Sequence, residues 1–102
     1  MYGLIGKIDA VPGERDALAE ILLNGLRDMP GCVSYVVARD SADADALWVT
    51  EVWESEAAHR ASLELPGVQD AIAQGRPKIG GFAQRVVTEP LGGHGLNQTK
   101  TS

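Results

Sequence analysis

The sequence has 102 residues, enough for one domain with a modest core that needs neither disulfides nor a structural metal. Its formal net charge of −5 describes a surface that repels nucleic-acid phosphates and anionic membranes, so neither is an expected partner. No apolar run approaches the ~20 residues of a membrane span. The start resembles no secretory signal, and the single Cys32 forms no internal disulfide, so we expect a cytoplasmic protein.

The first part of the chain predicts a strand, a helix and a second strand. Residues 2–10 are rich in β-forming side chains and end at a Val-Pro-Gly turn signal. Over residues 14–29 the apolar side chains recur at steps of three and four, which places them on one stripe of an amphipathic helix. Pro30 and Gly31 then end the helix. Residues 32–40 are β-branched and aromatic, as is typical of a strand.

The middle of the chain predicts a hairpin followed by broken helix. Residues 47–54 have the strongest β-propensity in the sequence, and the polar loop 41–45 before them is short enough for an antiparallel hairpin. Ser55 then resembles the N-cap of a short helix over residues 56–63. A second helical piece is expected over residues 66–74, because proline suits a first helical position.

The last part of the chain predicts one more strand and a tail. Glycines and prolines break the chain before residues 82–89, which form the fourth strand. Residues 91–102 are polar and glycine-rich, so we expect a flexible tail after a single domain over residues 1–90.

The resulting order is β-α-β-β-α-β, an α+β, ferredoxin-like arrangement with an antiparallel sheet. Both crossovers are right-handed, so the helices cover one face of the sheet. The strands nevertheless carry large apolar side chains on both faces; Trp53 and Trp48, for example, point in opposite directions. An uncovered apolar face of this size needs a partner, and we expect a homodimer that packs sheet against sheet.

The order and spacing of short motifs resemble the antibiotic biosynthesis monooxygenase family, and within it the small quinol monooxygenases. The motifs are a first strand that runs into V-P-G, then PGCVSYVVARD, then LWVTEVWESEAAHRASL before a proline and a short helix. The resemblance covers about residues 1–90. It implies a dimeric α+β barrel with a pocket between helices and sheet. Characterised members oxidise aromatic phenols or quinols with molecular oxygen and use no flavin or metal, whereas many others have no assigned activity.

One departure from the family concerns histidine. Many members carry histidines at the positions that align with Ser62 and Gly67, whereas this chain has His59 one helical turn earlier. His59, Ser62 and Leu63 share a helical face, so the resemblance implies that His59 and Ser62 reach the same pocket. There His59 is the candidate catalytic base, because imidazole exchanges protons near neutral pH. The alternative is a half-exposed histidine without chemistry.

Glu51 is the second candidate catalytic residue. It shares a face of its strand with Trp53, and a carboxylate among apolar groups is costly to bury unless it is paired. It would orient His59 or a substrate hydroxyl, or else pair with Arg39 or Arg85 within the sheet.

Ser62 and three aromatic residues are candidates for substrate binding. Trp53 and Trp48 would line an aromatic pocket, or else anchor the core or an interface, which is the usual place of tryptophan in small domains. Tyr35 would donate a hydrogen bond to a ligand or make a dimer contact. Cys32 is interpreted as a small buried hydrophobic residue, and His94 in the tail as inert.

Two functions stay open at this point. The first is a cofactor-independent monooxygenase that oxidises a small aromatic or quinol-type substrate with molecular oxygen, and we expect no cofactor and no metal site. The alternative is a non-catalytic dimer of the same fold that holds a small hydrophobic ligand. RNA binding is excluded because the third strand has no basic residue, and haem degradation is disfavoured because the first strand has no asparagine.

Overall fold

The computed structural model describes residues 1–96, and its elements follow the predicted order. The second helical region is split in two, as expected, and a short 3₁₀ turn (η1) precedes the last strand. The elements are β1 (Tyr2–Ala10), α1 (Arg15–Gly25), β2 (Cys32–Arg39), β3 (Ala46–Trp53), α2 (Glu56–Ser62), α3 (Pro66–Gly75), η1 (Arg76–Lys78) and β4 (Ile79–Thr88). The α+β ferredoxin-like fold is therefore confirmed.

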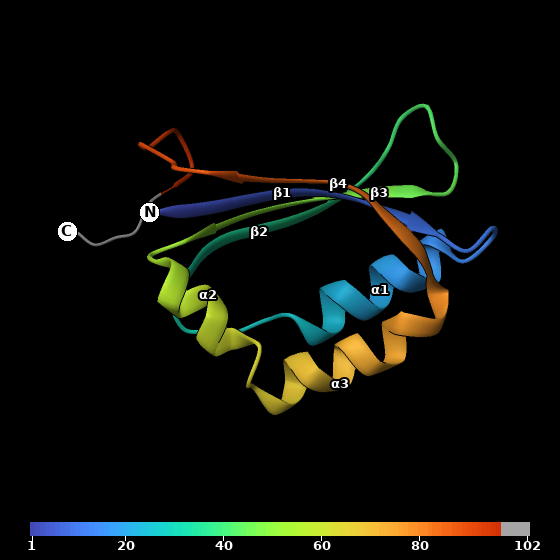
Figure 1. The fold of residues 1–102 in the computed structure, drawn as a ribbon, viewed down its shortest axis with the longest axis horizontal. Coiled ribbons are helices and arrows are strands. Elements are labelled where there is room, and N and C mark those ends of the chain that lie inside the picture. Colours follow the sequence, from blue (N-terminus) through green and yellow to red (C-terminus); the bar gives the residue numbers. More distant parts are fainter. Residues whose placement is uncertain (97–102) are drawn as a thin grey trace.

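The four strands form one antiparallel sheet in the order β2-β3-β1-β4. Figure 1 shows all three helices on the same side of this sheet, with α1 and α3 next to each other and α2 near the end of the sheet where β1 begins. One face of the sheet is therefore covered by helices, as right-handed crossovers require. No helix within residues 1–96 is long and apolar enough to cross a membrane.

The core lies between the sheet and the helices in two clusters. One joins Leu18 of α1 to Leu47 of β3, and both side chains are fully buried. The other places Trp53 at the end of β3 against Met29 and Val68. These side chains come from the helical stripe and from one face of β3, the combination that the periodicity predicts.

Helix α1 ends at Gly25, four residues before the predicted end at Met29. Asparagine and glycine at positions 24 and 25 are poor helix formers. Gly25 also lets α1 approach α3 closely, because a Cβ at this position would lie 2.5 Å from the Cβ of Ala71. Asp28 then adopts a left-handed conformation with φ of 54°, yet Met29 is still buried, so the apolar stripe continues past the helix itself.

Strand β4 begins at Ile79, three residues before the predicted start at Phe82. Gly80 and Gly81 were expected to break the chain, but both belong to the strand. A Cβ at Gly80 would lie 3.3 Å from the carbonyl oxygen of Asp9, and the β1–β4 register shifts twice in this region. The glycines therefore permit a close and irregular approach to β1.

The other face of the sheet is free of helices and carries apolar side chains. Val36, Thr50, Ile5 and Val86 form one row across the four strands through their pairing. Val36 and Val86 are 55% and 48% exposed. This is the face through which the homodimer is predicted to form. The predicted tail falls partly on residues 97–102, which lie outside the described residues.

Candidate active site

A cavity lies between the covered face of the sheet and the helices, and it has two adjoining parts. The part against β1 and β4 measures about 340 Å³, and the part under the helices about 320 Å³. Both parts are lined by Ile8, Tyr35, Glu51 and Phe82, so they meet along these side chains. Volumes of this size suit a small organic ligand.

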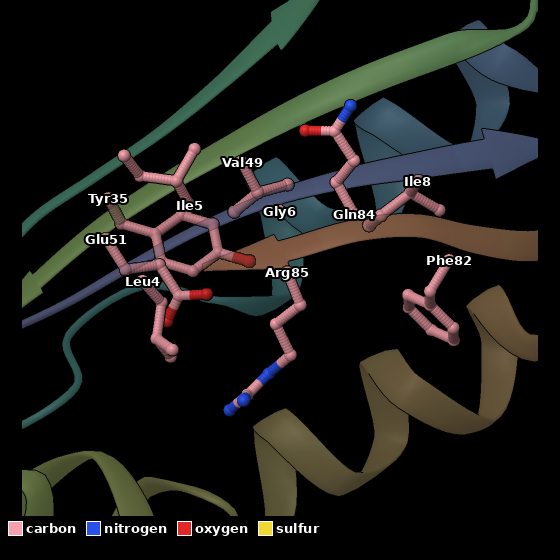
Figure 2. A pocket seen from close by; sticks show the side chains of 10 residues that line it. All are labelled: Leu4, Ile5, Gly6, Ile8, Tyr35, Val49, Glu51, Phe82, Gln84 and Arg85. Atoms are coloured by element: carbon pink, nitrogen blue, oxygen red, sulfur yellow. The ribbon is translucent and has the colours of Figure 1, made fainter. Parts of the chain in front are cut away.

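The floor of the cavity is the face of the sheet around Gly6. Figure 2 shows this region, in which Gly6 of β1 is paired with Val49 of β3 on one side and with Arg85 of β4 on the other. Leu4 and Ile8, two residues away along β1, line the same cavity because alternate residues of a strand share a face. Since Gly6 has no side chain, the floor is hollow at this point.

His59 reaches the cavity from α2. The hydroxyl of Ser55 accepts a hydrogen bond from the backbone N–H of Ala58 at 3.0 Å and so caps the helix, as the sequence predicts. The imidazole ring packs edge-on against Trp53, with 5.3 Å between ring centroids, and lies 5.6 Å from the ring of Tyr2. Two aromatic rings from the sheet therefore hold His59 at the cavity wall.

Glu51 lies beside His59. The Glu51 Oε1 atom is 3.9 Å from His59 Nε2, and each side chain is 17% exposed. The indole Nε1 of Trp53 donates a hydrogen bond of 2.9 Å to the same oxygen. This bond fixes the carboxylate, satisfies one of its oxygens in an apolar setting, and leaves it facing the imidazole.

Tyr35 lies directly across from Glu51 on the neighbouring strand. Burial raises the pKa of Tyr35, and the negative charge of Glu51 raises it further. The phenol therefore keeps its proton and is available as a donor in the cavity. Burial and Glu51 likewise raise the pKa of Cys32, which keeps it a thiol. The side chain is half-buried, so it is less enclosed than the sequence interpretation expected.

Ser62 lines the cavity and is 4% exposed, but its hydroxyl is engaged within its own helix. It donates a hydrogen bond of 2.6 Å to the carbonyl oxygen of His59. This contact holds the backbone at His59, so the structure supports a positioning role for Ser62 more directly than the predicted role in substrate binding.

Trp48 lies on the opposite face of the sheet and does not line the cavity, so the prediction that it lines the pocket is wrong. Alternation along β3 puts it one residue out of phase with Val49 and Glu51. Its indole Nε1 donates a hydrogen bond of 2.7 Å to Asp40 Oδ2. This bond, together with those from the N–H groups of Ala42 and Asp43, lowers the pKa of Asp40 to about 2. Trp48 therefore anchors the β2–β3 loop.

The alternative in which Glu51 pairs with Arg39 or Arg85 is wrong for the described residues. Arg39 instead binds Asp16 of α1, with 3.0 Å between Arg39 Nε and Asp16 Oδ1. Within residues 1–96, Arg85 forms no ion pair and no side-chain hydrogen bond. Its side chain lines the cavity, with Glu51 and Tyr35 on other parts of the same wall.

The structure thus brings together five of the six predicted site residues and adds others that the sequence did not reveal. His59, Glu51, Trp53, Tyr35 and Ser62 all line the part of the cavity under the helices. The residues that were missed include five on β1 and β4: Leu4, Gly6, Ile8, Phe82 and Arg85. The alternation of these side chains could be read from the sequence. The order of the strands beside β1 and their register could not. Within the part of the chain described, no group of three or more His, Cys, Asp or Glu side chains is placed to hold a metal ion.

Comparisons with known proteins agree with this fold. A crystal structure of a "putative Antibiotic biosynthesis monooxygenase" from Chloroflexus aurantiacus is 59% identical, with a TM-score of 0.92, over 94% of this chain and 98% of that one. A protein of the same description from Deinococcus radiodurans is 24% identical (TM-score 0.75, 91% and 95% covered), which shows the fold alone.

A Pseudomonas aeruginosa protein also shares the fold at 21% identity, with a TM-score of 0.77 and 89% and 94% of the chains covered. The comparison with curated proteins gives no match. The antibiotic biosynthesis monooxygenase family matches residues 1–74, which is most of the folded domain and includes His59 and Glu51. The chain belongs to the antibiotic biosynthesis monooxygenase family, and its membership supports a monooxygenase-like function.

Proposed function

We propose that this protein is a monooxygenase that oxidises a small aromatic compound bearing a quinol or phenol hydroxyl with molecular oxygen, without flavin or metal. The observation that carries the proposal is the meeting of His59 and Glu51 on the wall of a largely apolar cavity. Such a cavity binds an aromatic ring through its apolar lining and presents few polar groups to orient it.

His59 is the proposed base. It removes the proton of the aromatic hydroxyl, and the resulting anion is electron-rich enough to reduce molecular oxygen. For an anthrone-type substrate, one oxygen atom forms the new carbonyl at the ring CH₂ group, the O–O bond breaks, and the second oxygen leaves as water with the two hydrogens of that group. The substrate supplies all four electrons, so the step balances with oxygen as the only co-reactant.

Glu51 and Tyr35 are proposed to support this step. The carboxylate of Glu51, fixed by Trp53, stabilises the imidazolium that forms when His59 takes the proton. The protonated phenol of Tyr35 donates a hydrogen bond to the developing negative oxygen of the substrate. Trp53 offers a ring edge at the same wall.

A non-catalytic protein that binds a small hydrophobic ligand is the second candidate function. One observation favours it: the 3.9 Å between His59 Nε2 and Glu51 Oε1 is longer than a hydrogen bond, so the two groups are near each other without being joined. The catalytic proposal expects this contact to shorten when substrate fills the cavity.

Oxygen uptake separates the two candidates. Protein treated with chelators and offered a panel of quinols and anthrone-type phenols is expected to consume oxygen well above the autoxidation rate. Uptake at the background rate, together with measurable ligand binding, would instead establish the non-catalytic alternative.

The homodimer remains part of the proposal. The row of apolar side chains formed by the exposed Val36 and Val86 and the half-buried Ile5 supports it, because a monomer would leave this face in water. Light scattering is expected to give twice the chain mass of 10.8 kDa, and Val36→Lys with Val86→Lys to give the monomer mass. A monomeric parent protein would contradict this expectation.

A further inference from the structure

The cation at one end of the cavity is Arg85. Arg85 lines the cavity from β4, and within residues 1–96 it pairs with no carboxylate. The part of the cavity that it lines is otherwise mainly apolar, formed by side chains such as Leu4, Ile8 and Phe82. Arg85 is itself an exposed residue, so its guanidinium is accessible to an anion that enters the cavity. A charge-assisted hydrogen bond from a guanidinium to a carboxylate is stronger than one between neutral groups.

The carboxylate of Glu51 lies at the other end of the same floor. Glu51 and Arg85 belong to β3 and β4, the two strands that flank β1, and their partners on β1 lie two residues apart. Two inter-strand spacings and this offset separate their backbones by about 12 Å. Glu51 already has Trp53 and His59 as neighbours. The free charge in the cavity is therefore positive and lies away from the proposed base.

Between these two ends the floor is hollow at Gly6, and Tyr35 lines the same part of the cavity. Gly6 pairs directly with Arg85 and lies diagonally from Glu51, which is paired with Leu4. An aromatic ring placed over Gly6 has one edge toward Glu51 and His59 and the opposite edge toward Arg85. Figure 2 shows the Arg85 side chain extending to the helix side of the sheet, where such a ring would lie.

We infer that Arg85 is a specificity-determining residue and that the substrate is an anionic aromatic compound, with its hydroxyl at the His59 and Glu51 end and a carboxylate at the opposite edge bound by Arg85. The inference rests on the proposed function, because it takes the orientation of the hydroxyl from it. It adds the charge of the substrate and the residue that selects it.

Ligand binding without turnover tests the inference. The ligands are 6-hydroxy-2-naphthoate and 2-naphthol, which share the ring system and the hydroxyl and differ in the distal carboxylate. Isothermal titration is expected to show about 10- to 100-fold tighter binding of the naphthoate, the range of one charge-assisted hydrogen-bonded pair. Arg85→Gln should abolish this preference by lowering the affinity for the naphthoate to about that for 2-naphthol.

The control variant is Arg60→Gln, which changes the net charge equally at an exposed position on α2 that lies outside the cavity. It should keep the full preference. The inference would be overturned if the parent protein bound both ligands with equal affinity, or if the preference survived in Arg85→Gln. In either case the binding of 2-naphthol would leave the proposed function standing. If the preference behaves as expected but no quinol is turned over, the proposed function fails and the inference holds. If neither ligand binds, both fail.

Discussion

Replacing His59 by alanine is expected to lower the turnover of a quinol or anthrone-type substrate by about 10²- to 10⁴-fold, the usual contribution of a general base. The imidazole is the only group at the cavity wall that the proposal uses to accept the substrate proton, and Ser62 and the two aromatic rings serve to hold it there. The measurement is the initial rate of oxygen uptake at saturating substrate, compared with the affinity for 2-naphthol.

His94→Ala is the matched control, because His94 is the other histidine of the chain and lies outside both parts of the cavity. It should retain full activity. A His59→Ala variant that keeps more than about half the parent rate would show that His59 is not the base. A parallel loss of activity and of 2-naphthol binding would point to a purely structural role for the imidazole.

Replacing Gly6 by leucine is expected to weaken ligand binding without unfolding the protein. A Cβ at this position would lie 3.7 Å from the backbone oxygen of Gln84, an ordinary contact, so the new side chain has room to begin and then extends into the cavity. Overpacking of this kind costs about 1–3 kcal/mol, a loss of about 5- to 150-fold in affinity. Titration with 2-naphthol and thermal unfolding provide the two measurements.

Gly81→Leu is the control for this variant. Gly81 also lies in a strand, a Cβ there would meet nothing within 4 Å, and neither part of the cavity includes it. It should bind 2-naphthol as the parent protein does. Unchanged binding by Gly6→Leu would contradict the assignment of the cavity floor as the place of the ring.

Most of the fold was predictable from the sequence because the spacing of apolar residues differs clearly between its helices and its strands. The alternation at β3 and the three- and four-residue steps at α1 each match one type of element. The errors fell at glycines. Gly25 ends α1 early, whereas Gly80 continues β4, and only the packing against Ala71 and Asp9 separates these two uses of the same residue.

The candidate site was predictable where one strand and one helix supply it. Glu51 and Trp53 share a face of β3, and His59 shares a face of α2 with Ser62, so each pair follows from local spacing. Arg85 and Gly6 were missed because their role depends on strand order and register, which pairs them across β1 and β4. The prediction for Trp48 was wrong because it gave the aromatic character of the residue more weight than the alternation of side chains along β3.

The most direct test of the central claim is the fate of the oxygen atoms. Chelator-treated protein should be supplied with ¹⁸O₂ and an anthrone-type phenol, and the organic product examined by mass spectrometry. The proposal predicts one ¹⁸O atom in each product molecule, formed at a rate that falls with His59→Ala. A product without ¹⁸O, or one formed equally fast without the imidazole, would contradict a monooxygenase that works through His59.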